Sequence, residues 1–232
     1  MRNISIFSIL FLILFMSCSK ETHDLTVKTT IKGLQKGTLY LKKVEDTLLV
    51  TVDSLVINGN TVFELHSELD SPEVFYLYLD KNSKEEDRIT FFADKGVTEI
   101  NTTLKNFVFD AKIKGSEQQK TLEDYRLMMT RFTNRNLELI KENFEAQTVN
   151  DTAKLKALKK EYDNSIKRKY LYTVNFALNN NDSEVAPFLA LTEIYNAKYT
   201  FLDTINKMLT PKVKASKYGK ELQAFVDEIK PE

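Results

Sequence analysis

Apolar and polar side chains alternate along residues 25–115, which is the pattern of strands with one buried face. In "LTVKTTIK" (25–32), Leu25, Val27 and Ile31 fall on one side of the chain, and a period of two is typical of a half-buried strand. The same alternation, interrupted by turn-like clusters, predicts strands at 25–32, 37–43, 48–57, 61–69, 73–80, 88–94, 97–104 and 107–115. Short strands at regular spacing favour an antiparallel sandwich or an open barrel.

Glycines mark the first turns between these strands. The run "GLQKG" (33–37) has a glycine at each end, and we expect it to join strands 25–32 and 37–43 in a hairpin. Asn58 and Gly59 predict a second turn because both residue types tolerate a positive φ.

The apolar period changes to three and four residues after Ser116. Two long amphipathic helices are predicted, one with its apolar stripe between Leu122 and Phe144 and one between Leu155 and Ala177. The segment "TVNDTAK" (148–154) separates them, with Asp151 or Thr152 as the N-cap, so the pair forms an αα-hairpin. Shorter helices are expected at about 184–195, 199–209 and 212–229.

These patterns predict an α+β chain. An N-terminal antiparallel β-sandwich, or open barrel, spans residues 25–115, and a C-terminal all-helical module spans residues 116–232. Glycine is absent between Gly115 and Gly219, which agrees with a change from turn-rich strands to long helices.

The amino-terminal residues have the pattern of a lipoprotein signal. Arg2 precedes an apolar run from Ile4 to Met16, which is long enough for a signal peptide and shorter than the roughly 20 residues of a membrane span. "FMSC" resembles the lipobox, in which the cysteine is lipidated after cleavage, although Phe15 stands where leucine is usual. We therefore expect a signal peptide at 1–17, lipidation of Cys18 and a polar tether at 18–24. The alternative is an ordinary secretory signal followed by a chance cysteine.

The expected location is therefore a bacterial cell envelope. A diacylglyceryl group on Cys18 would supply two acyl chains, which is the threshold for stable anchoring. We expect anchoring to the outer membrane, on either its periplasmic or its surface side. The membrane would then be one partner, contacted through the N-terminal lipid.

Charge gives no indication of a nucleic-acid partner. The chain has 33 Lys and Arg against 33 Asp and Glu, and loss of residues 1–17 would leave 32 against 33. The basic run at 154–170 contains acidic residues and keeps an apolar stripe through Leu155, Leu158 and Tyr162. We interpret it as the solvated face of a helix, with attraction to anionic headgroups as the alternative.

No residue pattern indicates catalysis, a cofactor or a metal. Cys18 is the one cysteine, so a C-x-x-C pair for thiol–disulfide exchange is lacking. The two histidines are His23 in the tether and His66 on a predicted strand, whereas zinc needs three or four ligands. Phosphate-binding glycine loops and the nucleophile elbow are also absent from the sequence. We therefore expect no catalytic, cofactor or metal residues.

Several structural motifs resemble a group of Bacteroidetes lipoproteins. They are "TIKGLQKGTLYL", "DSLVINGNTVFEL" (53–65), Pro72 before a strand, "KGS" (114–116) and "VKASKYGKELQAFVDEI" (213–229). The resemblance implies an N-terminal β-rich domain of unknown function followed by a helical segment. In that group a thioredoxin-like domain of the TlpA/ResA type usually follows, whereas this sequence ends at Glu232. We therefore do not expect this chain to have the redox activity of the thioredoxin-like domain.

One predicted strand places aromatic side chains on both of its faces. Alternation in "EVFYLYLD" (73–80) directs Phe75, Leu77 and Leu79 into the sandwich core and leaves Tyr76 and Tyr78 outside. Phe92 would extend this outer stripe if strands 73–80 and 88–94 pair. The stripe is either covered by the helical module, through positions such as Met128, Met129 and Phe132, or a binding surface for a ligand or partner.

Three functions remain open from the sequence. The leading hypothesis is a non-enzymatic envelope lipoprotein that binds or scaffolds another protein of the envelope. The second is an accessory protein of a thiol–disulfide exchange pathway that works with a separate thioredoxin-like partner. The third is a cryptic hydrolase.

Overall fold

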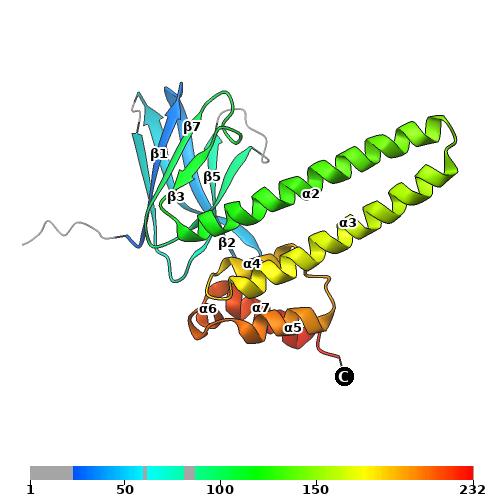
Figure 1. The fold of residues 1–232 in the computed structure, drawn as a ribbon. Helices are drawn as coiled ribbons and strands as arrows, with labels where there is room; N and C mark the ends of the chain where they lie inside the picture. The colour runs from blue at the N-terminus through cyan, green and yellow to red at the C-terminus, as the bar shows by residue number, and fades with distance from the viewer. Residues whose placement is uncertain (1–22, 60–61, 81–86, 232) are drawn as a thin grey trace, which may run out of the picture.

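The computed structural model describes residues 23–59, 62–80 and 87–231 and contains a two-sheet β-sandwich followed by helices (Figure 1). The strands are β1 (Leu25–Lys32), β2 (Lys36–Glu45), β3 (Leu48–Asn58), β4 (Val62–Ser67), β5 (Glu73–Asp80), β6 (Arg88–Ala93), β7 (Gly96–Thr103) and β8 (Lys112–Lys114). The helices are α2 (Glu117–Thr148), α3 (Thr152–Asn179), α4 (Val185–Thr192), α5 (Tyr199–Met208), α6 (Pro211–Ala215) and α7 (Lys217–Glu228). The predicted α+β class, with an N-terminal sandwich and a C-terminal helical module, is confirmed.

The sandwich core lies between two four-stranded sheets, ordered β4-β1-β7-β8 and β3-β2-β5-β6. The alternating pattern of β1 predicts its burial directly, since Leu25 and Val27 are fully buried between exposed or half-buried neighbours. Phe75, Leu77 and Leu79 of β5 also face this core, as expected.

The strand connections differ from the predicted hairpins. β1 and β2 belong to different sheets, so the hairpin expected at Gly33–Gly37 is wrong. Gly33 has a φ of 90°, and the turn carries Leu34 into the core, where it is 5% exposed. Burial of Leu34 between the sheets directs the chain across the sandwich and not back along the same sheet.

Two further strand predictions need correction. β1 pairs with β7 in parallel, so the sandwich is not wholly antiparallel; the long chain between these strands allows a parallel return. The strand expected at 107–115 is confined to Lys112–Lys114. Before it, the Phe107 carbonyl accepts a hydrogen bond from Thr102 Oγ1 at 2.7 Å, which folds the chain into a turn.

Helices α2 and α3 form the predicted αα-hairpin and extend well beyond the rest of the molecule (Figure 1). Ser116 caps α2 by accepting from Gln119 N–H at 3.0 Å. Asp151 caps α3 by accepting from Lys154 N–H at 2.9 Å, which confirms one of the two expected caps. The helix expected at 212–229 is divided, because Ser216 has an extended backbone and caps α7.

Candidate binding surface

The sequence-predicted site residues fall in different environments. Cys18 and the signal peptide lie outside the described residues. Phe92 is fully buried where the β6 end of the sandwich meets the helices, with its ring 5.6 Å from Phe188 and 5.7 Å from Tyr218 in edge-to-face contact. Tyr76 is half-buried at the edge of the same cluster.

Tyr78 lies on the outer sheet face beyond this cluster and is contacted by cations. Arg88 Nη1 donates to the Tyr78 hydroxyl at 2.9 Å, and Lys42 Nζ lies 4.7 Å from the Tyr78 ring centroid. The Arg88 guanidinium also lies 4.6 Å from the Tyr76 ring. These cation–π contacts cover part of the Tyr76 and Tyr78 rings on the outer side of the sheet.

The helical positions that cover the sheet differ in part from the expected ones. Met129 packs against the cluster that contains Phe92, together with the fully or nearly fully buried Leu122 and Tyr125. Phe132 instead packs on Tyr172 of α3, with ring centroids 6.1 Å apart, and it lines a small cavity between the helices with Met128. The sheet is therefore covered by the first turns of α2, since later turns point away from it.

Polar contacts fix the helices to the sheet at its base. Glu73 is 5% exposed and forms ion pairs with Lys43 at 3.2 Å and Lys217 at 2.5 Å. The Tyr218 hydroxyl accepts from Val74 N–H at 3.0 Å, and Gln119 Oε1 accepts from Phe92 N–H at 2.8 Å. Each of these bonds satisfies a buried backbone donor at the edge of the sheet–helix contact, so the hairpin is held on a well-defined base.

The distal half of the α2–α3 hairpin contains an apolar groove of about 660 Å³. Its floor contains Leu139 and Leu158, which are buried, and its sides contain Ile140, Phe144 and Tyr162, which are 43%, 64% and 38% exposed. Leu155, Asn143, Gln147, Lys156 and Lys159 complete the lining. Large apolar side chains gathered at this exposure are typical of a protein-binding surface.

The groove results from the length of the two helices. A helix rises about 1.5 Å per residue, so the 32 residues of α2 extend far beyond the 10 residues of α5. At the tip, the buried residues between the helices are Leu139, Ala146 and Leu158. Two helices alone leave part of each apolar stripe uncovered, because burial on all sides requires a third layer.

The rim of the groove is basic. Lys156 and Lys159 line it, whereas the lining contains no acidic side chain. Lys159 pairs with Asp163 at 2.8 Å, and Lys156 has no ion-pair partner among the residues that the structure describes. Across the full length of α3, the sequence contains seven basic residues and two acidic ones.

A second, polar cavity of about 540 Å³ lies where the sheets meet the starts of α2 and α6. Its lining includes Asp94, which accepts from Gln118 N–H at 3.2 Å, and Glu184, which is 1% exposed. Glu184 Oε2 accepts no hydrogen bond within the described part of the chain. Burial therefore raises the pKa of this carboxyl, with Lys212 opposing the effect and Asp94 and Asp182 adding to it.

The described residues contain neither a metal-type cluster nor a membrane-type helix. In 23–59, 62–80 and 87–231, no three His, Cys, Asp or Glu side chains are grouped to hold an ion. Within the same ranges, no helix combines the length and apolarity that crossing a bilayer requires.

Comparison with known proteins places the sandwich in a family of unknown function. The family described as Domain of unknown function (DUF4369) matches residues 25–122. This part of the chain is a DUF4369 domain. The DUF4369 match includes Gln119 and Leu122 of α2, which are the side chains that bond and pack against β6. No curated protein and no solved structure matches the chain.

The sequence indicated the apolar stripes of the hairpin but not the groove. Leu139, Ile140 and Phe144 belong to the apolar stripe predicted for the first long helix, and Tyr162 belongs to the stripe predicted for the second. The available signal was length, because the predicted helices at 184–195 and 199–209 are too short to cover both long stripes. The sequence pattern therefore identified the apolar residues that line the groove, but it did not show that they are exposed.

Proposed function

We propose that this protein is a lipid-anchored, non-enzymatic binding or scaffolding component of a bacterial cell envelope. The observation that carries the proposal is the exposed apolar groove in the distal half of the α2–α3 hairpin. Figure 1 shows that this hairpin projects away from the sandwich. A hairpin that is fixed to the sandwich at its base and has an exposed apolar surface near its tip is suited to binding a second protein. The lipobox-like "FMSC" and the resemblance to Bacteroidetes lipoproteins support the envelope location.

The groove has the composition of a binding surface. Phe144 and Tyr162 are aromatic, and interface centres are enriched in aromatic residues. Asn143, Gln147 and the two lysines form a polar rim around the apolar floor. This arrangement supports binding of a protein segment without any chemical step.

Crosslinking in intact cells tests the binding function. We expect the wild-type chain to form one discrete adduct with an envelope protein, and we expect Phe144→Glu to lose it because a charge in the groove opposes burial. Leu127→Glu is the matched control, since Leu127 is 61% exposed on α2 outside the groove. Equal adducts from all three chains, or none from the wild type, would contradict the proposal.

Fractionation tests the anchor separately. We expect the wild-type chain in the membrane fraction, with two or more acyl groups on Cys18 in the mass of the N-terminal peptide. Cys18→Ala should move the chain to the soluble fraction or leave its signal peptide uncleaved. An unmodified Cys18 in the wild type would refute lipid anchoring.

A further inference from the structure

We infer that the occupant of the hairpin groove is an amphipathic helix with acidic flanks, supplied by another protein. This inference rests on the proposed binding function and specifies the chemistry of the partner. The steps that lead to it are the continuity of one stripe on α3, the shape of the groove and the sign of its rim charge.

A helix already covers the base of the same stripe. Tyr162, Ile166 and Tyr170 follow one another at four-residue spacing on α3, which places them along one side of the helix. Tyr170 is covered, because its ring meets Phe201 of α5 edge-to-face at 5.7 Å. Further out, Ile166 and Tyr162 are 45% and 38% exposed, so the covered surface continues into an uncovered one.

The shape of the uncovered part fits another helix. The groove runs between two antiparallel helices, and its lining spans 139–147 on α2 and 155–162 on α3. A third helix that packs along two helices completes a three-helix layer, with apolar anchors at i, i+3, i+4 and i+7. At about 1.5 Å per residue, three turns, or about 11 residues, suffice to cover this length.

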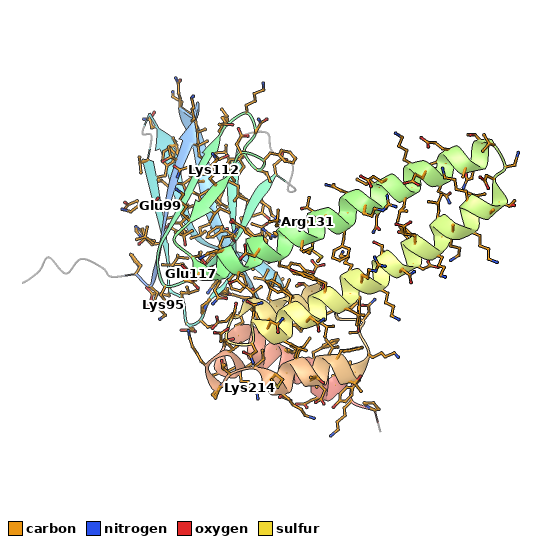
Figure 2. All side chains as sticks on the ribbon, in the orientation of Figure 1. Lys95, Glu99, Lys112, Glu117, Arg131 and Lys214 are labelled. Atoms are coloured by element: carbon orange, nitrogen blue, oxygen red, sulfur yellow. The ribbon has the colours of Figure 1, made fainter. Side chains whose placement is uncertain are left out.

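The positive charge at the rim of the groove determines which residues are favoured on the flanks of the bound helix. Lys156 and Lys159 face the rim and no acidic residue lines it. Both acidic residues of α3 already have partners, because Asp163 pairs with Lys159 at 2.8 Å and Glu161 pairs with Arg135 at 2.7 Å. Lys156 has no ion-pair partner among the described residues, so it carries the uncompensated positive charge of the rim. Figure 2 shows side chains projecting from both helices along the hairpin. An acidic partner therefore complements the rim, whereas a basic one is repelled.

A second copy of the chain fits this rim less well. Two hairpins placed face to face would bring the lysine rims of both copies to one interface, and the lining offers no carboxylate to pair with them. Like charges across an interface disfavour that pairing. Charge complementarity thus favours a different protein as the occupant.

Designed peptides test the inference on the purified full chain. One synthetic helix of about 14 residues carries leucines at i, i+3, i+4 and i+7 and glutamates on its flanks; its isomer carries lysines in place of the glutamates. In fluorescence anisotropy at low salt we expect the glutamate peptide to bind about tenfold more tightly. Phe144→Glu should abolish that binding, and Leu127→Glu should leave it unchanged.

Charge reversal gives the decisive readout. Lys156→Glu combined with Lys159→Glu should invert the preference, so that the lysine peptide binds more tightly. Equal binding of both peptides, or binding that persists in Phe144→Glu, would overturn the inference. So would self-association in sedimentation that Phe144→Glu removes, or binding to anionic phosphatidylglycerol vesicles in preference to the peptide.

The experiments distinguish an error in the inferred chemistry of the occupant from an error in the proposed binding function. If neither peptide binds while the crosslinked adduct in cells still depends on Phe144, the groove binds a partner of another chemistry. If the adduct is also independent of Phe144, the binding function itself is wrong.

Discussion

At the scale of single residues, the contact between sheet and helices depends on a few buried polar groups. Tyr218 is the clearest of them, because it is 9% exposed and its hydroxyl accepts the backbone N–H of Val74. The same burial raises the pKa of the Tyr218 hydroxyl, so it stays neutral at physiological pH. Its role is structural, since it satisfies a backbone donor near the start of β5, beyond the last residue of β5 that pairs with β2.

Tyr218→Phe should destabilise the fold while keeping its shape. Loss of the acceptor leaves the Val74 N–H buried without a partner, which costs about 1–3 kcal/mol. Chemical denaturation should report the loss as a lower midpoint with an unchanged slope. Tyr195→Phe is the matched control, because Tyr195 is 58% exposed; an equal effect of both substitutions would contradict the role of the hydrogen bond.

Glu184 makes stability depend on pH in the opposite direction to most carboxyls. Its pKa is raised above the ordinary value of 4.5 by burial, so the folded state holds the proton more tightly than the unfolded state. Stability is then highest below the ordinary pKa and falls as the pH rises through the raised value. Glu184→Gln should therefore increase the melting temperature at pH 7, and the gain should vanish near pH 4. A decrease at pH 7 would mean that Lys212 outweighs burial.

At the scale of elements, the junction between α6 and α7 requires glycine for space. A Cβ on Gly219 would lie 1.9 Å from the carbonyl oxygen of Val213, which already accepts hydrogen bonds from Ser216. Alanine is the better helix former by about 1 kcal/mol, but this contact is too short to be tolerated without moving backbone. The steric effect should outweigh the helix propensity.

Gly219→Ala should therefore lower the melting temperature. We expect a net loss of about 1–3 kcal/mol, as for other overpacked sites. Calorimetry against Lys220→Ala, an exposed position on the same helix, separates the two effects. A melting temperature raised by Gly219→Ala would show that helix propensity dominates.

Elements with strong periodicity were predictable, as was the turn between the two long helices, whereas the connections between the strands were not. The strand alternation of 25–32 and the stripes of both long helices are local patterns, so they appear in the sequence. The crossing from β1 to β2 depends on burial of Leu34 between two sheets, which is a tertiary effect. The parallel pairing of β1 with β7 joins residues about 70 positions apart, and local patterns contain no record of it.

The candidate site was predictable only in part for the same reason. The stripe through Leu139, Phe144 and Tyr162 was visible as apolar periodicity, whereas its exposure depends on how far α5 extends along the hairpin. Phe92 lies opposite Val74 and extends the outer stripe, as expected if β5 and β6 pair, but that Phe188 and Tyr218 are the rings that cover it was not visible in the sequence. Side chains from segments far apart in the sequence decide both outcomes.

At the scale of the whole molecule, sheet and helices should unfold together. The ion pair between Glu73 and Lys217, the hydrogen bond of Tyr218 and the cluster around Phe92 all cross the boundary between them. Thermal unfolding followed by far-ultraviolet circular dichroism and by tyrosine fluorescence should give coincident transitions. A helical transition clearly separated from that of the sandwich would show that the two parts are independent.

The central claim is that the groove face of the hairpin is the part of this molecule that meets a partner. The most direct measurement is site-specific photo-crosslinking in intact cells, with a photoreactive phenylalanine placed singly along α2. Positions 140 and 144 lie in the groove, while positions 127 and 141 lie outside its lining. We predict adducts of one mass from 140 and 144 and none from 127 and 141; adducts from all four positions, or from 127 and 141 alone, would contradict the account.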